Sequence, residues 1–263
     1  MSDLVLVQRR DDVAEVVLNR PDKRNAFNWS MMQALDAAIT QAGNMSGVRA
    51  VILRGEGRGF SAGIDVMAFD EIVDAFGADW RRNMFPVTAA FQNIVTKFER
   101  CPHPVICLMH TYALGLALEL ALACDFRIVS EGTIIGLPET RLGIVPDVGG
   151  TTRLTRLVGP GRAKEFIITG KNIPLDAAER WGLVNYIVPK GGLMDKANEL
   201  VAEIRLAAPL AVTYAKHVIN GVSEVERGLQ MEAWAQAQLM GSEDFEQGAQ
   251  SMITKQTPQW KGK

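Results

Sequence analysis

Short apolar runs rich in β-branched residues recur along the first half of the chain, and each predicts a buried strand. These runs are Val13–Leu18, Ala50–Arg54, Pro104–Met109 and Asp125–Ser130. Turn-forming residues follow the first run, and a helical pattern then extends from Ser30 to Ala42. Strands that alternate with helices in this way predict an α/β fold.

The pattern becomes wholly helical towards the C-terminus. Helices are expected over Leu193–Arg205, Pro209–Ile219, Val222–Met240 and Glu243–Thr254. No linker rich in Pro, Gly or Ser precedes them. We therefore divide the chain into an α/β core, residues 1–195, and a C-terminal helical region, residues 196–263, that packs on the core or on a neighbouring subunit.

The segment between residues 64 and 100 predicts helices around a break near Gly77. Its aromatic residues are expected to lie mostly in the core. They are Phe69, Phe76, Trp80, Phe85 and Phe91.

Composition narrows the class of protein. The 263 residues are 48% hydrophobic and 22% charged, which is ordinary globular usage. The 28 basic and 30 acidic residues form no continuous basic footprint, so nucleic acid is not an expected partner. No apolar run approaches the ~20 residues of a membrane span, and the N-terminus lacks a signal-peptide pattern, so we expect a cytoplasmic protein without a membrane partner. Cys101, Cys107 and Cys124 lack metal-site spacing and are expected to be reduced core residues.

One carboxylate is out of place by composition. Glu119 stands in the apolar run Ala113–Cys124, which predicts a buried helix. A buried carboxylate must be paired, coordinated or partly neutralised, because a bare charge there costs several kcal/mol, at least ~2. The sequence leaves two interpretations equally open: an ion pair with a distant arginine, or a catalytic group.

A second carboxylate, Glu139, lies in a stretch crowded with turn formers. Loops on a rigid scaffold commonly carry catalytic groups, and two carboxylates in different environments can act as acid and base. The alternative for Glu139 alone, a surface acid paired with Arg141, is the stronger one.

Glycine-rich residues between 55 and 63 raise two other classes of site, a serine hydrolase and a dinucleotide site. Gly59–Gly63 fits the G-x-S-x-G pattern and suggests a serine hydrolase using Ser61, but glycine-rich residues separate it from the preceding strand. The glycines of the 55–59 loop lack the G-x-G-x-x-G spacing of a dinucleotide site. We therefore expect no nicotinamide cofactor, and His103 and His110 are interpreted as structural residues.

Three stretches together resemble the successive signatures of the enoyl-CoA hydratase/isomerase (crotonase) superfamily. They are Gly57–Asp65, Tyr112–Ile128 and Leu137–Leu154, and weaker similarity covers nearly the whole chain. The resemblance implies a superhelix of repeated ββα units with a C-terminal all-α trimerisation region. It also implies a homotrimer or a hexamer made of two trimers.

The resemblance implies hydration of a 2-enoyl-CoA to a 3-hydroxyacyl-CoA. Glu119 would activate water, Glu139 would donate a proton, and the backbone N–H groups of Ile64 and Leu116 would form an oxyanion hole. No metal or separate cofactor is implied, because coenzyme A is part of the acyl-CoA substrate. The residues expected to contact that substrate are Lys23, Arg24, Ala26, Ala62, Gly63, Ile64, Asp65, Val66, Gly115 and Lys255.

Three departures from the family pattern leave alternatives open. Leu116 and Ala117 replace glycines, so the acyl pocket is expected to be narrower. Val66, Met67 and Ala68 stand where many members carry a lysine for the CoA phosphates, and Lys23, Arg24 or Lys255 would compensate. Asp147 occupies the place of a third carboxylate in dienoyl-CoA isomerases, so an isomerase using Glu139 and Asp147 is the alternative. An acyl-CoA-binding protein without catalysis is a further one.

Overall fold

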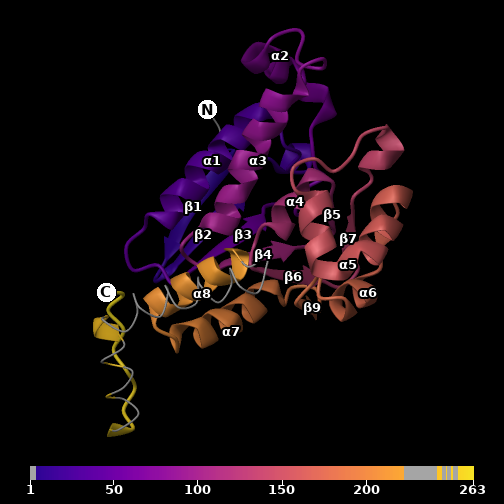
Figure 1. The fold of residues 1–263 in the computed structure, drawn as a ribbon. Helices are drawn as coiled ribbons and strands as arrows, with labels where there is room; N and C mark the ends of the chain where they lie inside the picture. The colour runs from indigo at the N-terminus through magenta and orange to yellow at the C-terminus, as the bar shows by residue number, and fades with distance from the viewer. Residues whose placement is uncertain (1–3, 222–241, 245–246, 248–249, 251–253) are drawn as a thin grey trace.

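A six-stranded sheet forms the centre of the molecule, as the computed structural model shows (Figure 1). The structure describes residues 4–221, 242–244, 247, 250 and 254–263. Along the sheet the strands are β1 (Val5–Arg10), β2 (Val13–Leu18), β3 (Ala50–Gly55), β4 (Val105–Met109), β6 (Phe126–Ser130) and β9 (Tyr186–Val188). β1 and β2 pair antiparallel, and every later pair is parallel.

A smaller sheet joins β5 (Tyr112–Leu114), β7 (Ile134–Gly136) and β8 (Asn172–Ile173). A single parallel bridge between Ser61 and Ala113 aligns the loop after β3 with β5. The chain therefore passes repeatedly from the main sheet to this second layer and then into a helix. Each such passage carries a loop to the same region of the molecule.

Helices cover both faces of the main sheet. The first four are α1 (Trp29–Gly43), α2 (Asp70–Phe76), α3 (Met84–Arg100) and α4 (Leu116–Leu122). The later ones are α5 (Gly150–Thr169), which bends at Gly159, and α6 (Leu175–Arg180), α7 (Leu193–Arg205) and α8 (Pro209–Gly221). Short 3-10 helices span Pro21–Lys23, Val66–Ala68 and Glu139–Leu142. None of the helices in the described part of the chain is long and apolar enough to span a bilayer.

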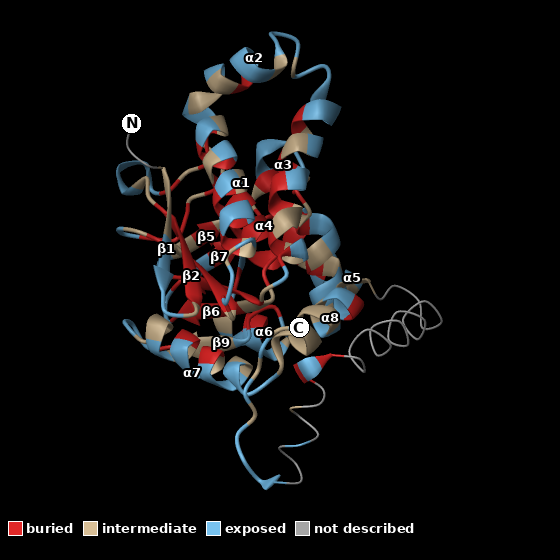
Figure 2. Ribbon diagram, turned by 90° about the vertical axis from the view of Figure 1, so that its left-hand side faces the viewer, coloured by how far each residue is buried: buried red, intermediate tan, exposed pale blue. Residues whose placement is uncertain are grey.

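The larger hydrophobic core lies between the sheet and helices α1, α3 and α4, as the buried residues in Figure 2 show. A second core fills the opposite face, where Ala197 and Val201 of α7 pack on β3, β4 and β6. In Figure 2, α2 projects from the body and is largely exposed.

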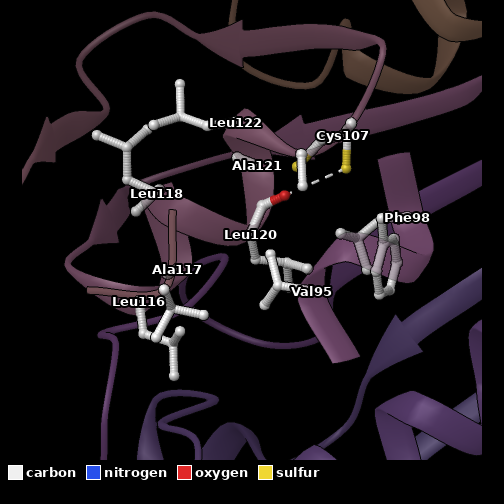
Figure 3. Packing of buried hydrophobic residues seen from close by; sticks show 14 of the residues in the cluster. Val95, Phe98, Cys107, Leu116, Ala117, Leu118, Leu120, Ala121 and Leu122 are labelled. Atoms are coloured by element: carbon white, nitrogen blue, oxygen red, sulfur yellow. Dashed lines mark hydrogen bonds between the residues drawn. The ribbon is translucent and has the colours of Figure 1, made fainter. Parts of the chain in front are cut away.

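Helix α4 lies in the middle of the larger core, and all seven of its residues are buried. Figure 3 shows its leucines packed among side chains of α3 and β4, including Phe98 and Cys107. The Sγ of Cys124 lies 3.5 Å from the carbonyl oxygen of Leu120. All three cysteines are free and buried, which confirms the prediction that they are reduced core residues.

The predicted α/β fold with alternating strands and helices is confirmed, and α7 has the predicted bounds. Strand β1 was not predicted, because its exposed polar half obscures the strand pattern. The prediction of a core position is wrong for Phe85, which is 88% exposed at the start of α3. The predicted helix 222–240 lies outside the described residues, and so does most of the helix expected over 243–254. The division at residue 195 and the trimer stay predictions.

Arg127, on β6, is a buried cation that fastens α4 to the body. Its guanidinium donates to the carbonyl oxygens of Leu183 and Cys124, at 2.6 Å each, and to that of Ala121 at 3.4 Å. Two of these carbonyls follow the end of α4 or lie in its last turn, where backbone acceptors lack helical partners. Burial lowers the pKa of Arg127 from its ordinary value, and the neighbouring Cys124, Cys107 and Asp125 oppose this.

We expect Arg127→Met to lower the free energy of unfolding by about 3 kcal/mol, because it leaves buried carbonyls without donors. Urea denaturation followed by circular dichroism measures the loss. Arg180→Met is the matched control, since Arg180 forms an exposed ion pair with Asp176 and the change there should cost less than ~1 kcal/mol. Equal losses in the two variants would contradict this role for Arg127.

Candidate active site

Backbone hydrogen bonds hold the turn after β2 against the loop after β3. The N–H of Ala62 donates to the carbonyl of Arg24 at 3.1 Å, and the N–H of Phe27 donates to the carbonyl of Gly63 at 2.8 Å. The N–H of Asp65 returns to the carbonyl of Phe27 at 2.9 Å. Residues 24–27 and 62–65, both predicted to contact substrate, therefore lie side by side.

The loop after β3 also lies against the start of α4. Gly63 has φ +90°, and a Cβ built on it would lie 2.6 Å from the carbonyl oxygen of Leu114 and 3.6 Å from the nitrogen of Leu116. Only glycine permits this close approach of the two backbones. In the described part of the chain, the N–H groups of Ile64 and Leu116 have no acceptor. The two predicted oxyanion-hole donors are thus brought together.

Glu119 is held by backbone donors. Its Oε1 accepts from the N–H of Gly150 at 2.7 Å and from the N–H of Val148 at 2.9 Å. The side chain is 2% exposed, and burial raises its pKa to about 8. The two N–H groups oppose this rise, and the nearby charges of Glu139 and Asp147 reinforce it. Among the described residues Glu119 is thus held by backbone N–H groups, and no described arginine forms the ion pair that was the alternative interpretation.

Glu139 begins the 3-10 helix Glu139–Leu142 and is also buried. A Cβ on Gly115 would lie 2.8 Å from its Oε1, so a side chain at that position would displace the carboxylate. Its Oε2 has no hydrogen-bond partner among the described residues. Burial raises the pKa of Glu139, and the charge of Asp147 adds to the effect. Arg141 donates instead to the carbonyl of Thr169, so it does not pair with Glu139.

Asp147 lies near both glutamates, since its charge raises the pKa of each, and its carboxylate is partly engaged. The hydroxyl of Thr88 on α3 donates to its Oδ2 at 2.6 Å. The side-chain amide of Gln92, one turn further along α3, donates to the backbone carbonyl of Asp147 at 2.5 Å.

A cavity of about 530 Å³ connects these groups. Glu119, Glu139 and Asp147 line it together with Ile64 and Leu116. Its opposite wall comes from α2, α3 and the loop between them. The apolar side chains of that wall are Phe69, Ile72, Trp80, Met84, Val87 and Phe91.

The other residues predicted to contact substrate differ in where they lie. Val66 lines the cavity, and Lys23 and Arg24 are exposed on the adjoining turn. The carboxylate of Asp65 is already occupied, because it forms a 2.6 Å ion pair with Arg20 and accepts from the N–H of Met67. Lys255 is exposed in the C-terminal segment, which lies away from α2 and α4 in Figures 1 and 2.

Ser61 has a structural environment. It is fully buried, and its hydroxyl donates to the carbonyl of Asn25 at 2.7 Å and accepts from the N–H of Gly63 at 3.2 Å. The ring of His110 contacts the carbonyl of Gly57 instead. The described residues thus give Ser61 no histidine base, and its hydroxyl supports the loop that carries Ile64.

Sequence reasoning missed the donors that hold Glu119. Val148 and Gly150 act through backbone N–H groups, which any residue type except proline provides. The Gly149-Gly150 pair was an available signal, because a Cβ on Gly150 would lie 2.7 Å from the Oε1 of Glu119. It also missed Thr88 and Gln92, whose relation to Asp147 depends on how α3 packs.

We expect the stability of the protein to fall as pH rises from about 4.5 to about 8. In that window the unfolded chain releases the proton of Glu119 while the folded chain retains it, so folding becomes less favourable. Glu119→Gln removes the titration and should raise the melting temperature relative to the wild type by at least ~4 °C at pH 8.5.

Melting curves at pH 5 and pH 8.5 test this expectation. The advantage of Glu119→Gln should be smaller at pH 5. There the folded wild type holds the proton of Glu119, and the unfolded wild type still holds part of it. The exposed Glu131 serves as the control, since Glu131→Gln should give the same difference at both pH values. A pH-independent effect of Glu119→Gln would contradict the assignment of a raised pKa.

The chain is similar to known proteins over nearly its whole length. A sequence model described as enoyl-CoA hydratase/isomerase matches residues 8–263. A short-chain-enoyl-CoA hydratase of Clostridium acetobutylicum is 37% identical over 95% of both chains. A carnitinyl-CoA dehydratase of Salmonella enteritidis is 34% identical over the full length of both.

Solved structures extend the similarity to the fold. The crystal structure of an enoyl-CoA hydratase from Bacillus anthracis superposes with a TM-score of 0.89 at 35% identity. It covers 99% of this chain and 100% of that one. The α/β architecture predicted from the sequence is thus the architecture of these enzymes. The chain belongs to the enoyl-CoA hydratase/isomerase (crotonase) family.

Proposed function

We propose that the protein is an enoyl-CoA hydratase, which adds water across the 2,3 double bond of a 2-enoyl-CoA to give a 3-hydroxyacyl-CoA. The observation that carries this proposal is the pair of buried carboxylates, Glu119 and Glu139, that line one cavity beside two backbone N–H groups without acceptors. In a pair of this kind, one carboxylate can take a proton from water and the other can give a proton to C2 of the substrate.

In this mechanism the thioester carbonyl oxygen accepts from the N–H groups of Ile64 and Leu116. Addition at C3 moves negative charge onto that oxygen, so the two donors bind the transition state more strongly than the substrate. Removing one donor of this type typically costs about 10²–10³ in rate. Gly63 and Gly115 serve the hole by allowing the backbones to approach.

The two glutamates carry the protons. Glu119 takes a proton from water as the water oxygen bonds to C3, and Glu139 delivers a proton to C2, so that water adds in the syn sense. The Oε1 of Glu119 is occupied by two N–H donors, which leaves its Oε2 for the water. The Oε2 of Glu139 accepts no hydrogen bond from the part of the chain that the structure describes, and it is available for proton transfer.

The remaining contacts follow the shape of the site. The acyl chain occupies the cavity between α2, α3 and α4, and the CoA portion runs along the turn with Lys23, Arg24 and Ala26 and the loop 62–66. Lys255 stays a candidate phosphate contact by sequence alone. Coenzyme A arrives as part of the substrate, and the mechanism requires no separate cofactor.

Isomerisation is the second candidate, because Asp147 lines the same cavity. An isomerase would remove a proton from one carbon and return it to another, using Glu139 and Asp147. The hydrogen bond from Thr88 engages one carboxylate oxygen of Asp147 and leaves the other, as the N–H donors do for Glu119, so the products of the reaction must separate the two candidates.

The products formed by one purified sample distinguish the candidates. We expect crotonyl-CoA to give 3-hydroxybutyryl-CoA, detected by loss of absorbance of the enoyl thioester and by mass spectrometry. A dienoyl-CoA isomerised by a sample that leaves crotonyl-CoA unchanged would overturn the hydratase proposal. Release of free CoA would indicate a hydrolase instead.

Glu119→Gln and Glu139→Gln should each lower kcat by at least ~10³, because each leaves the reaction without one of its proton carriers. Binding of a saturated acyl-CoA, measured by calorimetry, should change little. Glu131→Gln, which alters a carboxylate outside the cavity, is the control and should keep wild-type kcat. Ser61→Ala should also retain most of the rate, and a loss as large as that of Glu119→Gln would favour the hydrolase.

The rate of hydration should follow a bell-shaped pH profile. Burial raises the pKa of both glutamates, and the charge of Glu139 raises that of Glu119 further, so the pair holds one proton over an intermediate range. The form that reacts is the one in which this proton is on Glu139 and Glu119 is ionised. At low pH both are protonated and no base is present. Above pH about 8 the pair loses its last proton and no acid is present. Measured kcat should therefore fall on both sides, and a flat profile between pH 5 and pH 9 would contradict the proton-sharing pair.

A further inference from the structure

A line of polar side chains on α3 contacts the segment that holds Glu119. Thr88, Gln92, Thr96 and Glu99 follow one another at intervals of four, four and three residues, so they lie on one face of the helix. Their side chains form hydrogen bonds with Asp147 and Arg153, and Glu99 also lies 3.8 Å from the guanidinium of Arg156. The apolar side chains on the remaining face, such as Phe91, belong to the cavity wall or the core.

The contacts of this polar line fall into two parts. Thr96 and Glu99 bind the guanidinium of Arg153, at 3.1 and 2.8 Å, and so fasten α3 to α5. Thr88 and Gln92 instead hold Asp147, through its carboxylate at 2.6 Å and its backbone carbonyl at 2.5 Å. The residue after Asp147 is Val148, whose N–H donates to Glu119.

We propose that Thr88 and Gln92 are positioning residues that orient the carboxylate of Glu119 through the Asp147–Gly150 segment. This inference rests on the proposed hydratase function and deepens it. Thr88 fixes the side chain of Asp147 and Gln92 fixes its main chain, so together they set the direction in which the next N–H groups point. Glu119 then keeps one oxygen bound and the other turned towards water.

Helix α3 thus contacts both the acyl chain and the segment that holds Glu119, the proposed base. Helix α3 contributes Met84, Val87 and Phe91 to the apolar wall that the acyl chain contacts. The same helix holds the segment that orients Glu119. A misplacement of ~1 Å at a reacting group can cost about 10²-fold in rate, so this coupling makes catalysis sensitive to how the chain packs on α3.

Thr88→Val tests the proposal, because it replaces the hydroxyl by a methyl group of similar size. We expect kcat for crotonyl-CoA to fall about tenfold while KM stays within about twofold. Thr88→Ser keeps the hydroxyl and should restore kcat to within about twofold of the wild type. Gln92→Met should lower kcat in the same direction.

The pH profile separates positioning from a general loss of structure. The N–H donors of Val148 and Gly150 lower the pKa of Glu119, whereas burial and the charges of Glu139 and Asp147 raise it. If Thr88→Val loosens the donors, the pKa of Glu119 rises further. The alkaline limb of the kcat profile should then move to higher pH, a change that partial unfolding does not produce.

Thr96→Val is the matched control, because Thr96 lies on the same face of α3 but binds only Arg153, which Glu99 also holds. Thr96→Val should keep the wild-type kcat, and the alkaline limb of its kcat profile should stay at the wild-type pH. Equal kcat in Thr88→Val and the wild type, or equal losses in Thr88→Val and Thr96→Val with unmoved limbs, would overturn the positioning role while leaving hydration intact.

Amide hydrogen exchange provides a readout that does not depend on activity. Peptides that contain the N–H groups of Val148 and Gly150 should exchange faster in Thr88→Val than in the wild type, and at the wild-type rate in Thr96→Val. Unchanged exchange would overturn the proposal. If the wild-type protein does not hydrate any enoyl-CoA, the proposed function fails, and the exchange data alone then decide whether Thr88 holds the segment.

Discussion

The site depends on a carboxylate that is buried yet bound only by backbone donors. Glu119 lies in the centre of the core, where none of the described arginines or lysines forms an ion pair with it. The N–H of Val148, just before α5, and the N–H of Gly150, its first residue, donate to the Oε1 of Glu119. This interaction keeps the group polar and poised, because burial raises its pKa and the donors limit the rise. It also ties together two segments almost thirty residues apart, so the fold and the chemistry share one contact.

Much of the site was predictable from residue types. Glu119 stood out because a charge inside a long apolar run conflicts with its surroundings, whereas Ile64 and Leu116 were indicated by the family resemblance. Strands β2, β3, β4 and β6 were equally visible, because apolar β-branched residues run along strands that are buried on both faces. In these cases the residue types alone indicate where the residues lie in the fold.

The rest of the site depends on relations that residue types do not encode. Backbone N–H groups are nearly identical at every position, so nothing distinguishes Val148 as a donor before the segment is placed. Thr88 resembles any threonine on an exposed helix until α3 packs beside Asp147. Phe85 shows the opposite error, because an aromatic side chain that reads as core is 88% exposed beyond the edge of the helix packing.

The two sides of the cavity differ in how freely they can change. On the side of Glu119, the close approaches at Gly63, Gly115 and Gly150 leave no room for a single added carbon. On the side of α2, Phe69, Ile72 and Trp80 contribute only side-chain surface, which hydrophobic substitutions of similar volume preserve. Variation accepted on that wall would alter which acyl chains fit without altering the reaction. Related proteins could thus keep the proposed catalytic groups unchanged and differ only in the acyl chains that they accept.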